Sequence, residues 1–190
     1  RGNSASYVKE KYNFLIAGSS EDEIFENPAI NAVIITTQHN THSFLASKAL
    51  SKGKCVFVEK PLGLNIAELD AVAKTAQTSS GFFQVGFNRR FAPIFQRAKS
   101  EIDSLGGPKH MVFRINAGPI PEDSWIQTPA EGGGRIIGEM CHFIDLARYF
   151  VGSPIVSLIS DSTRKGKDFC DDVAVSISFS DGSLASISYT

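Results

Sequence analysis

Gly53-Lys-Cys-Val-Phe-Val-Glu-Lys-Pro61 is the segment from which the architecture of this 190-residue chain is best inferred. Its apolar centre, residues 55–58, predicts a short strand that ends directly in charged residues. Similar apolar runs cover residues 14–17, 32–36 and 81–85. Between them, the spacing predicts helices that begin at Thr41 and after Asn65, the latter with Glu68 as capping-box partner. Short apolar strands that alternate with helices indicate a parallel sheet covered on both faces.

The pattern changes in the second half of the chain. Residues 108–116 and 173–179 alternate between apolar and polar, and Asp181-Gly182 predicts a hairpin turn after the second of these segments. A helix is predicted over 134–151, between these antiparallel strands. We therefore expect an α/β fold, with a partial Rossmann parallel sheet in residues 1–105. An α+β domain with a mostly antiparallel sheet should occupy residues 106–190.

The composition excludes several classes of function. Nineteen Lys and Arg residues balance 20 Asp and Glu residues, so nothing favours a nucleic-acid partner. No apolar run approaches the roughly 20 residues that span a bilayer, so no membrane partner is expected. Cys55, Cys141 and Cys170 have no zinc-ligand spacing. We expect reduced thiols, a cytoplasmic location and no metal.

Polar residues follow two of the predicted strands, where ligands of open α/β sheets bind. Thr36-Thr-Gln-His-Asn-Thr-His42 follows the first, and its small hydroxyl side chains would admit a ribose or phosphate. The alternative is an ordinary polar loop with a helix cap. Glu59-Lys60-Pro61 follows the second, and a cis Lys-Pro bond would fix its backbone. Lys60 could then act on a substrate hydroxyl, although a surface Glu-Lys pair is the competing interpretation.

A third segment, residues 131–145, begins with Gly132-Gly-Gly134 and continues as the predicted helix. Glu139, His142 and Asp145 form a polar stripe on an otherwise apolar helix, and such groups need partners or a cleft. Histidine commonly transfers protons near neutral pH. The alternative is a core histidine bonded to Asp145. The three glycines are not a GxGxxG motif, because they follow a loop and not a parallel strand.

In this order, the segments resemble the glucose-fructose oxidoreductase / inositol dehydrogenase family, also called Gfo/Idh/MocA. Further hallmarks are Val33-Ile-Ile-Thr-Thr37 and Asn88-Arg-Arg-Phe91. The resemblance implies a dehydrogenase that binds NAD or NADP and transfers a hydride to or from a secondary hydroxyl of a sugar, cyclitol or sugar nucleotide. It also implies a homo-oligomer built through the open face of the C-terminal sheet.

The resemblance also implies roles for individual residues. Lys60 would be the catalytic lysine, and His142 and Glu139 would share the proton transfer. The expected cofactor contacts are Thr36, Thr37, Asn40, His42, Glu59, Lys60, Pro61, Asn88 and Arg90. The expected substrate contacts are Lys60, Arg89, Trp125, Arg135, Glu139, His142 and Asp145.

Two departures from the family pattern carry expectations of their own. Many members have an aspartate four residues before the histidine, where this chain has Gly138. Glu139 would have to replace it from a helical angle about 100° away. This favours, as an alternative, a non-catalytic module that senses a dinucleotide or a sugar. The chain also contains no Gly-rich turn after a first strand, so we expect the 190 residues to bind NAD(P) weakly or not at all.

Overall fold

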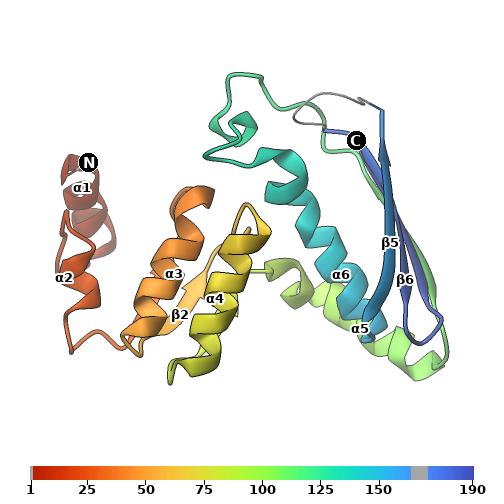
Figure 1. Cartoon of the computed structure of the whole chain (residues 1–190), viewed down its shortest axis with the longest axis horizontal. Coiled ribbons are helices and arrows are strands. Elements are labelled where there is room, and N and C mark those ends of the chain that lie inside the picture. The colour runs from red at the N-terminus through yellow and green to blue at the C-terminus, as the bar shows by residue number, and fades with distance from the viewer. Residues whose placement is uncertain (1, 164–170) are drawn as a thin grey trace.

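The structure is a computed structural model that describes residues 2–163 and 171–190. Its first sheet has the strand order β1-β2-β3 and is parallel throughout (Figure 1). The strands are β1 (Ala32–Ile35), β2 (Cys55–Val58) and β3 (Phe83–Val85), and the helices α3 (His42–Ser51) and α4 (Ile66–Thr78) connect them. This arrangement confirms the partial Rossmann sheet.

The core of this unit lies between the sheet and its two helices. Val56 and Val58 are buried and belong to the same apolar cluster as Leu50 of α3 and Val72 of α4. Asn65 caps α4 as predicted, because its side chain accepts a hydrogen bond from the Glu68 N–H at 3.0 Å. The expectation of two covered faces is wrong at β1, where Ile34 on the opposite face is 73% exposed.

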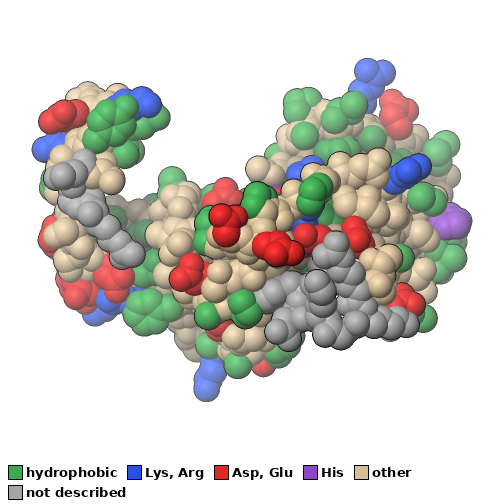
Figure 2. Space-filling model, turned by 90° about the horizontal axis from the view of Figure 1, so that it is seen from above, with side chains coloured by type: hydrophobic (Ala, Val, Ile, Leu, Met, Phe, Trp, Pro, Cys, Tyr) green, Lys and Arg blue, Asp and Glu red, His purple; other side chains and the backbone are tan. Residues whose placement is uncertain are grey.

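The strand predicted over residues 14–17 is also wrong. That segment follows helix α1 (Gly2–Tyr12), precedes α2 (Asp22–Phe25), and forms no strand. Leu15 is 93% exposed, so this apolar run finds no sheet to pack against. Figure 2 shows this N-terminal end of the molecule as an arm beside a hollow.

The second sheet has the order β4-β7-β6-β5. Its strands are β4 (His110–Ile115), β5 (Ile155–Ser162), β6 (Val173–Phe179) and β7 (Leu184–Tyr189). The predicted hairpin joins β6 to β7, and the pairs β5–β6 and β6–β7 are antiparallel. β4 instead runs parallel to β7, which corrects the expectation that it is antiparallel. The sheet is therefore mixed but mostly antiparallel, as the fold class required.

Helix α6 (Cys141–Val151) packs on the inner face of the second sheet. It continues a π-helical turn, η4 (Ile136–Met140), so the predicted helix over 134–151 is present but not uniform. Phe150 of α6 contacts Phe95 of α5 (Pro93–Leu105) and Phe113 of β4, with ring centroids 6.0 and 6.4 Å apart. These contacts join α5 to the second sheet. Short 3-10 helices are η1 (His39–Thr41), η2 (Asn88–Phe91) and η3 (Trp125–Gln127).

Two further sequence predictions concern the membrane and the thiols. Within residues 2–163 and 171–190, no helix has both the length and the apolar character that crossing a bilayer requires. Cys55 and Cys141 are free thiols, as expected. Cys170 lies outside the described residues.

Candidate active site

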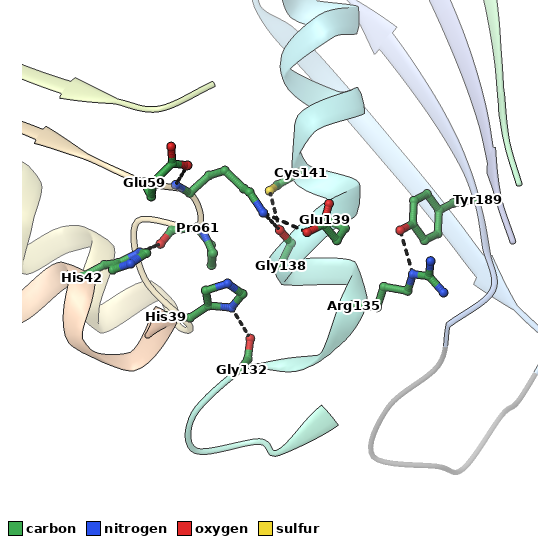
Figure 3. A network of polar contacts seen from close by, with 11 residues as sticks. His39, His42, Glu59, Pro61, Gly132, Arg135, Gly138, Glu139, Cys141 and Tyr189 are labelled. Atoms are coloured by element: carbon green, nitrogen blue, oxygen red, sulfur yellow. Dashed lines mark hydrogen bonds and ion pairs between the residues drawn. The ribbon is translucent and has the colours of Figure 1, made fainter. Parts of the chain in front are cut away.

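Lys60 joins the two units at the carboxyl edge of the parallel sheet, through its contacts with Gly138 and Glu139, which are labelled in Figure 3. It follows β2 directly, and its bond to Pro61 is cis. Its Nζ donates hydrogen bonds to the Gly138 carbonyl at 2.8 Å and to Glu139 Oε1 at 2.9 Å. The Lys60 side chain is only 14% exposed. A surface pair with Glu59 is therefore not what forms: Glu59 accepts the Lys60 main-chain N–H instead, at 3.3 Å.

The glycine segment 132–134 directs the chain into the helix that meets Lys60. A Cβ on Gly132 would lie 2.3 Å from the backbone of Ile126, so only glycine fits that approach. Gly133 and Gly134 have φ values of 72° and 81°, which other residues rarely adopt. The π-helical turn follows at once and presents the Gly138 carbonyl and the Glu139 carboxylate to Lys60. Such turns are frequent at functional sites.

His142 lies one turn further along the same helix and is buried. Its Nδ1 has no hydrogen-bond partner among the described residues, and its ring meets the edge of Phe87 at 6.1 Å. Burial lowers the pKa of His142, and the positive charges of Lys60 and Arg89 lower it further. Asp145 does not bond to the imidazole; it accepts two hydrogen bonds from the Arg90 guanidinium. The interpretation as a core histidine satisfied by Asp145 is therefore wrong.

The loop after β1 lies at the same carboxyl edge of the parallel sheet, beside the loop that carries Lys60. Thr36, Thr37 and Asn40 are exposed there. His42 is buried, with Nδ1 2.8 Å from the Pro61 carbonyl and Nε2 2.9 Å from the Thr37 carbonyl. It therefore ties the loop after β1 to the loop after β2. The exposed hydroxyl and amide groups fit a dinucleotide, and the buried Nδ1 of His142 is left without a hydrogen-bond partner among the described residues.

Several predicted site residues do not reach Lys60. The Trp125 ring packs edge-on against His39 at 4.7 Å. Arg135 is buried on the far side of the helix turn, where it donates to the Tyr189 hydroxyl at 2.8 Å and to the Gly118 carbonyl (Figure 3). Arg89 lies over the Phe143 ring at 4.6 Å. Asn88 is exposed at the start of η2.

An apolar hollow of about 550 Å³ adjoins the centre, between residues 61–69 and the helix. Phe87, Met140 and Cys141 contribute to its wall. Burial raises the pKa of the Cys141 thiol to about 11, so this cysteine is protonated and a poor nucleophile. Sequence reasoning missed Phe87, and it also missed His39, which donates to the Gly132 carbonyl at 2.8 Å. The sequence feature that could have indicated a buried ring such as His39 is the glycine at position 138, because the absence of a side chain there leaves room for one.

Comparison with known families agrees with the sequence resemblance. A model of the oxidoreductase family with an NAD-binding Rossmann fold matches residues 2–87, and a model of the GFO/IDH/MocA C-terminal domain matches residues 95–190. The chain belongs to the GFO/IDH/MocA family of oxidoreductases. The family identified from the motifs is thus confirmed.

Relatives in the GFO/IDH/MocA family include two inositol dehydrogenases. The chain is 38% identical over 143 residues to scyllo-inositol 2-dehydrogenase (NAD(+)) of Bacillus subtilis. The aligned region covers 73% of this chain and 41% of that protein. The chain is 31% identical over 159 residues to myo-inositol 2-dehydrogenase of Thermotoga maritima. Here the aligned region covers 82% of this chain and 46% of that protein. The chain therefore spans less than half the length of these relatives.

A similar solved structure is levoglucosan dehydrogenase in complex with NADH and levoglucosan. Its TM-score is 0.89 at 25% identity, and the match covers 100% of this chain and 55% of the other. A probable dehydrogenase from Thermotoga maritima matches with a TM-score of 0.85 at 29% identity, over 99% and 58% of the two chains. Both likenesses extend across the two units, including the helix that carries His142.

Proposed function

We propose that the intact protein is an NAD-dependent dehydrogenase that acts on a secondary hydroxyl of a sugar, cyclitol or sugar nucleotide. Lys60 is its acid–base group, with Glu139 and His142 as partners. One observation carries the proposal: a largely buried ammonium is held between a backbone carbonyl and a carboxylate, at the ligand-binding edge of a parallel sheet. The substrates and the cofactor of the relatives described above support the substrate class and favour NAD over NADP.

The contacts of Lys60 suggest how it handles a proton. An ammonium has three donors, and two of them bind Gly138 and Glu139. The third is left for the oxygen of a substrate hydroxyl. During oxidation, Lys60 in its amine form takes the hydroxyl proton. Glu139 is 35% exposed and bonded to Lys60, so it connects the amine to water and gives the proton a path out.

His142 adds a second group that can hold a proton. Because burial and nearby positive charges lower its pKa, the imidazole is neutral near pH 7 and can accept a hydrogen bond or a proton. Its unpartnered Nδ1 is the atom we assign to this role. The bound cofactor would supply the hydride acceptor. Thr36, Thr37, Asn40 and the loop of residues 59–61 would line its binding edge.

The test uses the full-length protein with NAD and a panel of inositols and anhydrosugars. Lys60→Met should lower kcat roughly 10²-fold or more, the usual scale of acid–base help. Lys52→Met is the matched control, because Lys52 is a surface lysine that pairs with Glu26 far from the site. Near-normal turnover in Lys60→Met would remove the assignment. NADH binding without turnover or isotope exchange on the whole panel would instead favour the sensing module.

We further propose that these 190 residues alone bind NADH weakly, because their sequence contains no Gly-rich turn after a strand. Trp125 is the only tryptophan of the chain, so energy transfer from it to bound NADH reports binding directly. The expected titration is flat or shallow up to high cofactor concentration. A saturable signal at low micromolar NADH would contradict the proposal.

The proposal includes an organisation of the whole protein. Residues 1–105 would hold the cofactor and residues 106–190 the substrate and a second copy of the chain. The outer face of the second sheet supports the last point: Val112 and Ile159 on it are 74% and 71% exposed, and small side chains such as Ser176 and Ser186 lie between them. A cytoplasmic location, favoured by the free thiols, is part of the same proposal.

A further inference from the structure

The His39 imidazole occupies the contact between the end of β1 and the segment that leads into the π-helical turn (Figure 3). The ring is 8% exposed, and its Nδ1 lies 2.8 Å from the Gly132 carbonyl. A carbonyl only accepts hydrogen bonds, so Nδ1 is the donor. The next residue adds a parallel contact, because the Asn40 N–H donates to the Glu131 carbonyl at 3.1 Å. Two successive residues of η1 therefore hold the glycine segment.

The ring has little freedom to move. Trp125 packs edge-on against it at 4.7 Å between centroids, and the His42 ring lies 5.9 Å away. Burial lowers the pKa of His39, and the nearby Lys60 charge lowers it further, against the raising effect of the bond to Gly132. The imidazole is therefore neutral near pH 7 and adds no charge beside the Lys60 ammonium.

Gly138 lies directly against this ring. A Cβ on Gly138 would come 3.0 Å from His39 Cε1, which is tighter than ordinary packing, and 3.5 Å from Nδ1, which is an ordinary contact. The same Gly138 carries the carbonyl that binds Lys60 Nζ at 2.8 Å. The ring thus touches the residue that fixes the ammonium. Any side chain at position 138 would have to displace either the ring or that carbonyl.

We propose that His39 is a positioning residue of the Lys60 centre, matched to Gly138, and that it sets the place of the Gly138 carbonyl through its contacts with Gly132 and Gly138. The catalytic part of this inference rests on the proposed dehydrogenase function. It predicts that positions 39 and 138 depend on one another. A change at one should alter the effect of a change at the other, because both act on the same carbonyl.

The experiment is a double-mutant cycle in the full-length protein with His39→Ala, Gly138→Ala and the double variant. Each single variant should lower kcat about tenfold or more, with the Kd for NADH changed by less than about threefold. The double variant should lose at least about fivefold less than the product of the single losses. His39→Asn, which keeps a donor near the place of Nδ1, should recover part of the activity. His110→Asn, at an exposed histidine of β4, is the control.

The inference fails if the two kcat losses simply multiply, or if His39→Ala keeps normal kcat. A second readout does not need activity: the NMR resonance of Lys60 Cε in isotopically labelled protein, assigned by its loss in Lys60→Met. This signal should move in Gly138→Ala and return toward its original position in the double variant. If it does so while no dehydrogenase activity is found, the proposed function fails and the positioning role stands. An unmoved signal in both single variants overturns the role itself.

Discussion

At the scale of single residues, the centre is held by backbone carbonyls as much as by side chains. Lys60 binds the Gly138 carbonyl, His39 binds the Gly132 carbonyl, and both nitrogens of His42 face carbonyl oxygens. A backbone carbonyl does not titrate, so it still accepts hydrogen bonds at a pH that protonates carboxylates. The lowered pKa values of the buried imidazoles of His39 and His142 make the centre sensitive to acid.

The two histidines with lowered pKa give a prediction about stability. The pKa values of His39 and His142 are lowered in the folded state, chiefly by burial, so the unfolded chain binds more protons below its ordinary histidine pKa of about 6.5. The stabilisation is therefore complete above that pKa and is lost as pH falls through the lower folded values. Denaturant unfolding of the full-length protein at about pH 7.5 and about pH 5.5 should show this loss.

The matched comparison is the variant with both His39→Asn and His142→Asn. Its unfolding free energy should change less between the two pH values than that of the original protein, because two of the titrating groups are gone. An equal pH dependence in both proteins would show that these imidazoles do not account for the loss.

At the scale of elements, the two units are joined by contacts between a strand end or short helix and the long helix. Lys60 bridges from β2 to η4, and Arg90 of η2 forms a forked ion pair with Asp145 of α6. Asp145 is 7% exposed, so the guanidinium satisfies a carboxylate that has little contact with water. This pair fixes the angle between η2 and α6.

Removing the Asp145 charge should therefore destabilise the protein. Asp145→Asn should cost about 1–3 kcal/mol in unfolding free energy, the usual penalty when a buried polar group loses its partner. Asp22→Asn breaks the exposed surface pair with Lys48 and should cost clearly less. Chemical denaturation of both variants measures the difference. Equal losses would mean that the buried pair is worth no more than an exposed one.

The helices and strands also show how much of the fold can be predicted from the sequence alone. Residues 55–58 were predictable as a continuous apolar run, and residues 173–179 because their alternation matches their burial. The strand β5 was not predicted, because a register shift between Ile155 and Ser157 breaks its alternation. The apolar run 14–17 was predicted as a strand but is not one. A suitable pattern does not ensure that a neighbouring strand is available for pairing.

The same limit applies to the candidate site. Lys60 and Glu139 could be proposed because charged residues stand at a strand end and on an apolar helix. The partner of Asp145 and the unpartnered state of His142 Nδ1 could not, because they depend on which elements meet in space. His39 looked like one polar residue in a loop, and the role we propose for it rests on its contacts with Gly132 and Gly138.

At the scale of the whole molecule, α6 covers one face of the second sheet, and no helix from the described part of the chain covers the other (Figure 1). We expect a second copy of the chain to cover the open face. Ile159→Lys should lower the oligomeric state of the full-length protein, because it places a charge in an apolar contact. Ile94→Lys, at an equally exposed position on α5, is the control. Sedimentation that shows the same assembly for both variants would contradict this interface.

Because of the π-helical turn, the number of residues in the segment 136–140 matters as well as their identity. Such a turn takes up one residue more than an α-helical turn. Deleting one residue between Ile136 and Met140 would let the turn become α-helical and would change which carbonyl and which side chain face Lys60. Grafting side chains from a homologue whose segment is one residue shorter or longer would therefore misplace the lysine's partners, even if every chemical group were copied. Alignments used to engineer this family should be checked for length here before they are checked for identity.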